Sequence, residues 1–575
     1  MKLVRGGTMG MAGVLLALLA GCTAATQNGA TVSAPAASPG VVPAPLSIAV
    51  DATAAPFRID RHVRILGNPD AAAALTAIVA ARTGTAVPAR ESAPPAAESA
   101  PSAPESAPSA PESAPSAPES APSAPESAQQ TPESAPTIAL RIEPGGAAES
   151  YRITADAASV VVTGADAAGL FYGVQTLGQL IIRNGSGFVV PAARIADAPR
   201  FAYRGVMLDV ARHFFPVETV KAYIDRASGL KLNALHLHLS DDQGWRIQLD
   251  SRPRLTERAA ATAVGGDAGG FYSKADYREI VAYAASRHMI VVPEVDVPGH
   301  THAVGLAYPE LAEEPDLPHL VSDGEGAPPV AGTPYTGTAV GFSSLKIHDE
   351  ATYDFVADVM GELAAMTPGP YLHIGGDEAL GTDPDDFALF MARATGIVAD
   401  LGKIPVTWHE AGAAPDIDPS TIGQYWGFTT PTDGADEKAR AFADSGGVIL
   451  SPADAVYLDM KYDASSPFGL TWANGPTSVQ RAYSWEPASI IDGVDEDDIL
   501  GVEAPLWTET IRTLDDIDRM AFPRVAAAAE IAWSSADGEL RTWESFRSRV
   551  GALGPLWTSL GIRFHASDEI PWATQ

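Results

Sequence analysis

The chain has 575 residues, more than one ordinary domain needs and enough for a large α/β barrel with a smaller partner domain. Hydrophobic residues make up 46% of it and aromatic residues 7%, so a chain that is disordered throughout is excluded. The formal net charge of -33, from 38 basic and 71 acidic residues, disfavours nucleic acid and acidic polymers as partners, because phosphate binding requires clustered Lys and Arg.

Residues 1–22 have the layout of a secretory signal. Lys2 and Arg5 precede an apolar run at 9–20 that is too short to span a bilayer comfortably. The run leads into LAGC, which resembles a bacterial lipobox, so we expect cleavage before Cys22 and lipidation of its thiol. Two or more acyl chains would anchor the protein stably. We therefore expect an extracytoplasmic protein, at the cell surface or in the periplasm; the alternative is a chance cysteine in a plain signal peptide.

Residues 23–45, rich in Ala, Thr, Ser and Pro, predict a flexible tether, and residues 46–196 predict a small α+β domain. Its strand-like segments are LSIAV, IALRIE, SYRITA and SVVVTG; its helix-like segments are AAAALTAIVAART and AAGLFYGVQTLGQLII.

At about 91–136 a glutamate recurs every seven residues in ESAPSAP units. Without apolar positions, and with a proline every three or four residues, these units cannot form a coiled coil. They predict an extended, disordered insert of no assigned function.

Residues 197–575 contain eight short apolar runs that each end in polar or aromatic residues. The runs are RGVMLD, LNALHLHLS, MIVVPEVD, YLHIGGDE, IPVTWHE, TIGQYW, VILSPADAVYLD and ILGVEAPLW. Amphipathic segments separate most of them, although the fifth and sixth lie too close for a full helix between them. This pattern predicts an α/β protein with a (β/α)₈ barrel as its catalytic domain and the active site at the carboxyl ends of the strands. A doubly wound open sheet is the alternative, but no glycine-rich phosphate-binding motif follows the first strand.

The strongest local feature is HIGGDE at 373–378, where Asp377 and Glu378 end an apolar, glycine-rich strand. Neighbours on a regular strand point to opposite faces, so both carboxylates can reach one ligand only where the strand gives way to a loop. A buried carboxyl beside a second negative charge suits an acid that protonates a leaving oxygen near neutral pH. Taken alone, the pair is equally compatible with the start of a helix, which acidic residues favour.

Seven motifs, taken in order, resemble those of glycoside hydrolase family 20 over residues 46–575. They are RGVMLDVARHFFP (204–216), HLHLSDDQGWRI (236–247), VVPEVDVPGH (291–300), HIGGDE (373–378), WHE (408–410), YLD (457–459) and VEAPLWTE (502–509). The resemblance implies an exo-acting β-N-acetylhexosaminidase that retains configuration and uses the substrate's own 2-acetamido oxygen as nucleophile. It further implies that Glu378 is the acid/base and that Asp377 orients the acetamido group and stabilises its developing charge.

The resemblance also implies a set of sugar-binding residues. Arg204 would hold hydroxyls at the non-reducing end, with Glu509 and Asp459 as further hydroxyl partners. Tyr457 would donate to the acetamido carbonyl. Aromatic walls would come from Trp408, Trp426 and Trp507. Supporting roles near the catalytic glutamate would fall to Asp242, Asp296 and His300.

The expected partners are β-linked N-acetylhexosamine oligosaccharides or glycoconjugates, together with the membrane through Cys22. Neither a cofactor nor a metal is expected. Two alternatives stay open. His236 and His238 share a strand face, and His-x-His at a barrel strand end is also a metal-site pattern, so a metal-dependent amidohydrolase is one rival. The other is a glycan-binding surface lipoprotein with an inactive barrel.

Overall fold

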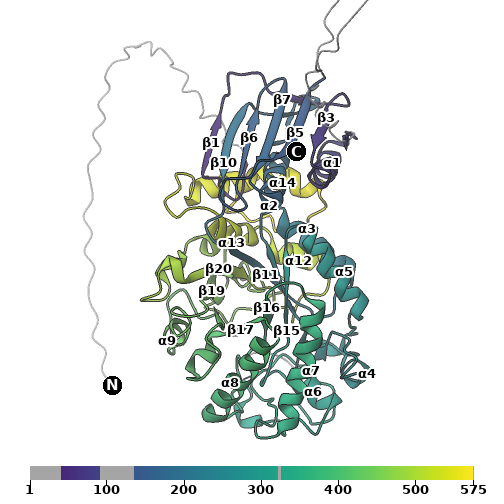
Figure 1. Ribbon diagram of the computed structural model, residues 1–575, viewed down its shortest axis with the longest axis vertical. Coiled ribbons are helices and arrows are strands. Elements are labelled where there is room, and N and C mark those ends of the chain that lie inside the picture. The colour runs from purple at the N-terminus through teal and green to yellow at the C-terminus, as the bar shows by residue number, and fades with distance from the viewer. Residues whose placement is uncertain (1–39, 88, 91–134, 322–325, 574–575) are drawn as a thin grey trace, which may run out of the picture. The chain divides into compact units, whose positions relative to one another are not determined.

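The computed structural model describes residues 40–87, 89–90, 135–321 and 326–573 (Figure 1). The signal segment with Cys22, most of the tether and most of the heptapeptide insert lie outside these residues, so those three predictions stay as they were. None of the helices within the described ranges is long and apolar enough to cross a membrane.

The N-terminal domain is built on a seven-stranded mixed sheet with the order β1-β10-β6-β7-β5-β3-β4. Its strands are β1 (Ser47–Val50), β3 (Arg64–Gly67), β4 (Ala89–Arg90), β5 (Thr137–Ile142), β6 (Tyr151–Ala155), β7 (Ser159–Gly164) and β10 (Ala193–Asp197). A second sheet, β2-β9-β8, comprises Phe57–Ile59, Gly187–Val190 and Ile182–Asn184. All four predicted strands of this domain are confirmed.

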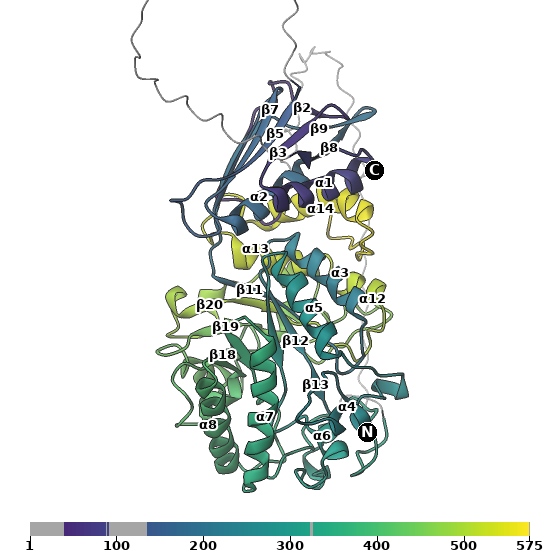
Figure 2. The same ribbon diagram turned by 45° about the vertical axis from the view of Figure 1, so that its right-hand side comes forward.

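Two helices cover one face of the larger sheet, α1 (Pro69–Thr83) and α2 (Ala167–Leu180), as Figure 2 shows. Each begins at a side chain that caps the exposed amides of the first turn: Asn68 accepts from Ala71 N, and Asp166 accepts from Gly169 N. The C-terminal helix α14 (Trp543–Ser559) lies beside α1. Both helices predicted from the sequence are thus confirmed, to within a few residues at their ends.

The catalytic domain is a closed barrel of eight parallel strands, as predicted. The strands are β11 (Tyr203–Asp209), β12 (Ala234–His238), β15 (Ile290–Glu294), β16 (Tyr371–His373), β17 (Ile404–Trp408), β18 (Ile422–Tyr425), β19 (Val448–Leu450) and β20 (Ile499–Ala504). Nearly every residue in them is buried, which explains their continuous apolar runs, because helices cover the outside of a parallel barrel. The main outer helices are α3 (Val217–Ser228), α5 (Lys274–Ala285), α7 (Glu350–Met366), α8 (Pro384–Asp400), α12 (Leu514–Ala521) and α13 (Arg524–Trp533) (Figure 1). Between β17 and β18 the chain forms only a short 3₁₀ turn, His409–Ala413, which confirms the expected degenerate crossover.

The predicted boundary of the tether at residue 45 is wrong. Val41 and Val42 are fully buried. The Gln179 side chain bonds both backbone groups of Val42, and the Arg549 guanidinium donates to Val41 O at 2.7 Å. The folded chain therefore includes residues 40–45, because a pair of valines among Ala and Pro supplies enough apolar surface to pack beneath α2 and α14.

Candidate active site

A pocket of about 440 Å³ opens at the carboxyl ends of the barrel strands. It is lined by Arg212, Val321, Thr338, Val340, Asp377, Glu378, Trp426, Tyr457, Asp459, Lys461, Gly469, Leu470, Thr471, Trp472, Trp507 and Glu509. The predicted catalytic pair and five of the seven predicted sugar-binding residues thus line one cavity. It lies at the carboxyl ends of the barrel strands, where the sequence pattern predicted the active site.

The loop after β16 turns the carboxyls of the predicted catalytic pair, Asp377 and Glu378, into this pocket. Gly375, Gly376 and Glu378 all have positive φ, at 65°, 99° and 44°. A Cβ on Gly375 would stand 1.8 Å from Asp296 Oδ1, so only glycine fits there, and the Gly376 amide donates to the same oxygen at 3.0 Å. The next helix, α8, begins at Pro384 with Asp383 as its cap. The helix-start interpretation of Asp377 and Glu378 is therefore wrong.

His300 links the carboxyls of the site. Its Nε2 lies 3.4 Å from Glu378 Oε2 and 3.7 Å from Asp377 Oδ2, while its Nδ1 lies 3.2 Å from Asp241 Oδ1. Burial alone would lower the pKa of His300, but the charges of Asp241, Asp296 and Asp377 outweigh it and raise the pKa well above its ordinary value. His300 is thus a cation beside the catalytic pair, which favours its predicted supporting role.

Burial raises the pKa of Asp377 and of its neighbour Asp296, and for Asp296 the charge of Asp377 adds to the effect. Asp296 lies beneath the glycine turn and holds it through the Gly376 amide. This contact supports the predicted role of Asp296 beside the glutamate. Asp242 is placed differently: Oδ1 accepts from His302 N and Ser343 Oγ, so it holds the loop after β15. The adjacent Asp241 contacts His300 instead.

Several residues that line the pocket carry buried acceptor oxygens without a hydrogen-bond partner in the described part of the chain. Among the described residues, both carboxyl oxygens of Asp459, Glu509 Oε2 and Asp377 Oδ1 are buried yet make no hydrogen bond. Burial raises the pKa of Glu509 to about 7 and that of Asp459 well above its ordinary value. Unpaired buried carboxyls are costly, so their convergence on one cavity indicates a ligand that supplies several hydroxyl or amide donors.

The prediction that Arg204 holds sugar hydroxyls is wrong. Arg204 lies near the start of β11, at the other end of the barrel, and is fully buried. It forms an ion pair with Glu149 at 2.8 Å and packs over Trp533. It is therefore a contact between the two domains. Residues at the amino ends of barrel strands serve stability rather than chemistry.

The arginine in the pocket is Arg212, just past the end of β11. Its Nη2 pairs with Asp241 at 2.7 Å, its guanidinium lies over the Trp507 ring at 4.8 Å, and its Nε has no partner among the described residues. The sequence motif RGVMLDVARHFFP contains both arginines, and their positions relative to the predicted strand could have separated them.

The three predicted tryptophans have different roles. Trp426 and Trp507 line the pocket, and Trp426 Nε1 lies 3.0 Å from both carboxyl oxygens of Glu410. Trp408 is fully buried behind Trp507, with ring centroids 6.0 Å apart, so it supports the wall rather than lining it. Trp472, which no sequence motif singled out, also lines the pocket and is partly exposed.

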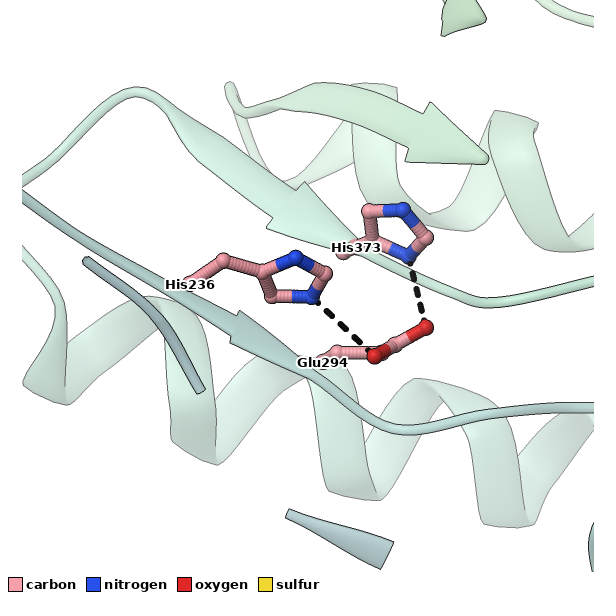
Figure 3. A group of neighbouring side chains, drawn as sticks. All are labelled: His236, Glu294 and His373. Atoms are coloured by element: carbon pink, nitrogen blue, oxygen red, sulfur yellow. Dashed lines mark ion pairs between the residues drawn. The ribbon is translucent and has the colours of Figure 1, made fainter. Parts of the chain in front are cut away.

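The His-x-His pair lies below the pocket in a network of ionic contacts. His236 Nε2 lies 3.0 Å from Glu294 Oε2, and His373 Nδ1 lies 3.1 Å from Glu294 Oε1 (Figure 3). The Gly375 amide nitrogen also lies 3.0 Å from His373 Nδ1. His236 and His238 therefore contact the barrel's own carboxylates, and protein groups already occupy the face that suggested a metal site.

Comparison with known proteins agrees with this geometry. Residues 38–198 match the profile of glycosyl hydrolase family 20, domain 2, and residues 201–385 and 380–536 match that of the family 20 catalytic domain. The chain belongs to glycosyl hydrolase family 20. As the sequence motifs led us to expect, this family 20 member is a glycoside hydrolase, and the metal-dependent and inactive-barrel alternatives are not favoured.

Several relatives cover most of this family 20 chain. A β-N-acetylhexosaminidase of Cellulomonas fimi is 44% identical over 427 residues, which are 74% of this chain and 82% of that one. A solved family 20 β-N-acetylglucosaminidase is 63% identical, with a TM-score of 0.81 over 93% of this chain and 100% of the other. The Streptomyces plicatus N-acetyl-β-hexosaminidase, solved with thio-NAglucal, is 41% identical, with a TM-score of 0.78 over 93% and 98% of the two chains.

Proposed function

We propose that this family 20 hydrolase is an exo-acting β-N-acetylhexosaminidase that removes terminal β-linked N-acetylglucosamine or N-acetylgalactosamine by substrate-assisted catalysis. The observation that carries the proposal is the pairing of Glu378 with a buried Asp377 whose Oδ1 has no hydrogen-bond partner within the described ranges, in a pocket also lined by Tyr457. An acetamido N–H would satisfy that oxygen. The relatives described above are named for this activity, and the Streptomyces plicatus enzyme has also been solved with GlcNAc as product.

In the first step the acetamido carbonyl oxygen attacks the anomeric carbon while Glu378 donates its proton to the departing glycosidic oxygen. The bond to the leaving group breaks, and an oxazolinium ion forms on the sugar. In the second step the Glu378 carboxylate takes a proton from water, and the hydroxide opens the ring at the anomeric carbon. Two inversions retain configuration. No enzyme carboxylate attacks the sugar, so the rate depends on how tightly the acetamido group is held.

Asp377 and Tyr457 hold the acetamido group from its two ends. The Asp377 carboxylate accepts the N–H and stabilises the positive charge that develops on the nitrogen. Burial raises the pKa of Tyr457 well above its ordinary value, so its phenol keeps the proton that it donates to the carbonyl oxygen. Trp426 and Trp507 enclose the sugar and the acetamido methyl with apolar surface.

Exo action is what the polar lining of the pocket favours. Arg212, Asp459 and Glu509 all line the cavity, and each presents a buried polar atom without a partner among the residues that the structure describes. Hydroxyls of a terminal sugar fill these positions, whereas a further sugar unit on that side would collide with them. Reduced, end-blocked chitin oligomers should therefore resist internal cleavage, and release of internal fragments would contradict this assignment.

The direct test compares a nitrophenyl β-N-acetylglucosaminide with the corresponding plain β-glucoside. Only the first should be hydrolysed, because the second lacks the internal nucleophile; equal rates on both would refute substrate assistance. A thiazoline analogue of the oxazolinium should also inhibit far more tightly than N-acetylglucosamine. A protein that binds chitobiose yet releases no sugar on long incubation would be a lectin instead.

We also propose that the mature protein is held at a membrane by acyl chains on Cys22. The support is the LAGC sequence after a basic start and a short apolar run, together with the single cysteine of the chain. Radiolabelled fatty acid supplied to expressing cells should label the wild-type chain and not Cys22→Ser. Equal labelling of both chains, or of neither, would refute the anchor.

A further inference from the structure

Glu294, the last residue of β15, is a fully buried carboxylate that the mechanism above does not use. Its Oε1 accepts the Trp408 indole N–H at 2.9 Å. Its Oε2 lies 3.0 Å from His236 Nε2 and also contacts His238 Nδ1. Figure 3 shows His236 and His373 approaching this carboxylate from neighbouring strands. One side chain thus joins several strands directly beneath the pocket.

Two routes lead from Glu294 to groups that line the pocket. Along the first, it fixes the edge of Trp408, which packs against Trp507 and against the cluster containing Tyr457. These contacts make the back wall of the acetamido subsite. A shift of the Trp408 indole would therefore alter the position of the internal nucleophile, to which rates are sensitive on the scale of an ångström.

Along the second route, Glu294 acts through His238. The His238 Nε2 lies 2.8 Å from Asp241 Oδ2, and the same oxygen forms the 2.7 Å ion pair with Arg212 Nη2. The orientation of the arginine that we assign to the sugar hydroxyls thus depends on Asp241, and that of Asp241 depends on His238. Glu294 therefore influences both the position and the electrostatic environment of Arg212 through His238 and Asp241.

The charges explain why a carboxylate is needed at this place. Burial alone would lower the pKa of His238, and so would the nearby Arg212 guanidinium, but the charge of Glu294 and the bonds to Asp241 and Glu294 raise it to about 9. His238 is therefore a cation near neutral pH and donates from both ring nitrogens, one to Glu294 and one to Asp241. A neutral imidazole could donate from only one of them.

We infer that Glu294 is a positioning residue for the reaction, which fixes both the acetamido wall through Trp408 and the hydroxyl-binding Arg212 through His238 and Asp241. This inference rests on the proposed function of the pocket. Glu294 touches no reacting atom; it acts through its neighbours.

The test is Glu294→Gln, with Glu503→Gln as the matched control. Glu503 is an equally buried barrel carboxylate that bonds His236 Nδ1 at 2.9 Å and Gln424 Nε2 at 2.8 Å, and it contacts neither Trp408 nor His238. We expect Glu294→Gln to lose about 10- to 100-fold in kcat/KM on the nitrophenyl N-acetylglucosaminide, the equivalent of one charge-assisted hydrogen bond. Glu503→Gln should lose much less at a comparable melting temperature.

The pH profile separates positioning from simple loss of packing. Without the Glu294 charge, His238 faces Asp241 and the cation Arg212, so it should lose its proton at lower pH. The alkaline limb of kcat/KM should then begin about one pH unit or more below that of the wild type. Glu294→Asp, which keeps the charge, should restore the limb while recovering only part of the rate.

Two results would overturn the inference while leaving the proposed function intact. One is an active wild type in which Glu294→Gln and Glu503→Gln lose the same activity in proportion to their melting temperatures. The other is an unchanged pH limb in Glu294→Gln. A wild type that fails to cleave the N-acetylglucosaminide at all would instead refute the proposed function, so the two failures are distinguishable.

Discussion

Replacing Glu410 with glutamine should stabilise the protein at alkaline pH and leave it unchanged in acid. Glu410 follows β17, and both its oxygens lie 3.0 Å from Trp426 Nε1. Burial, reinforced by the charge of Asp377, raises its pKa to about 8 from an ordinary value of 4.5. Glutamine has the shape of the protonated acid and still accepts the indole N–H, so Trp426 should keep its place.

The size of the effect follows from proton linkage. Between the unfolded pKa near 4.5 and the folded pKa near 8, the unfolded chain releases this proton while the folded protein keeps it, so stability falls as pH rises. The full shift corresponds to roughly 5 kcal/mol, at 1.36 kcal/mol per pH unit. Because the Glu410 side chain retains 19% exposure, solvent screening should reduce this to about 2–3 kcal/mol.

The assay is thermal or urea unfolding of both chains at pH 4.5 and pH 8.5, with activity measured in parallel. The stability advantage of Glu410→Gln should be near zero at the lower pH and reach its full size at the higher one. Activity near neutral pH should be retained, because Glu410 is mostly protonated there. Glu437→Gln, on the exposed face of the nearby helix α9 (Ala435–Arg440), is the control and should show no such trend. A stability difference that does not change with pH would refute the reasoning.

Four further substitutions test the roles of single residues. Glu378→Gln should lose about 10²- to 10⁴-fold or more in kcat at an unchanged melting temperature, because only proton transfer is removed; a well-folded, fully active variant would rule out Glu378 as the acid. Arg212→Lys should raise KM several-fold with little effect on unfolding, since lysine cannot reproduce the fixed fork of donors, whereas Arg204→Lys should lower the melting temperature and leave KM unchanged; the reverse outcome would restore the original assignment. Tyr457→Phe should reduce kcat and weaken thiazoline binding together, by about tenfold for one lost hydrogen bond to a charged intermediate, and a change in KM alone would argue against a contact made in the transition state.

The barrel could be predicted because its signals are local, whereas the catalytic roles of Asp377 and Glu378 came from the resemblance to family 20 and stay a prediction. Each of the eight buried parallel strands appears in the sequence as an apolar run. In HIGGDE the two adjacent glycines predict a turn, because both adopt the positive φ that other residues rarely adopt. The place of Arg204 near the start of its strand argues against a role in the sugar site, whereas Arg212 follows the end of that strand. Position along the strand carried more information than residue type.

Other residues have roles that no local sequence pattern predicts. Val41 and Val42 look like part of a low-complexity tether until α2 and α14 cover them. Glu294 is an acidic residue in a largely apolar run, and only the closure of the barrel brings it to His238, 56 residues away in the sequence. Trp472 comes from a long connection after β19, whose path no periodicity predicts. Contacts between segments far apart in sequence decide these roles.

The edge position of β4 has a practical consequence for protein engineering. Among the described strands β4 pairs only with β3, at the rim of the sheet, and β3 pairs with β5 on its other side, so the connection from Arg90 to Thr137 starts at this rim. Each doubling of such a loop costs only about 0.6 kcal/mol of closure entropy. We therefore expect this rim to be a suitable insertion site for a reporter or an affinity module. Such a module could replace the native insert without changes to either hydrophobic core.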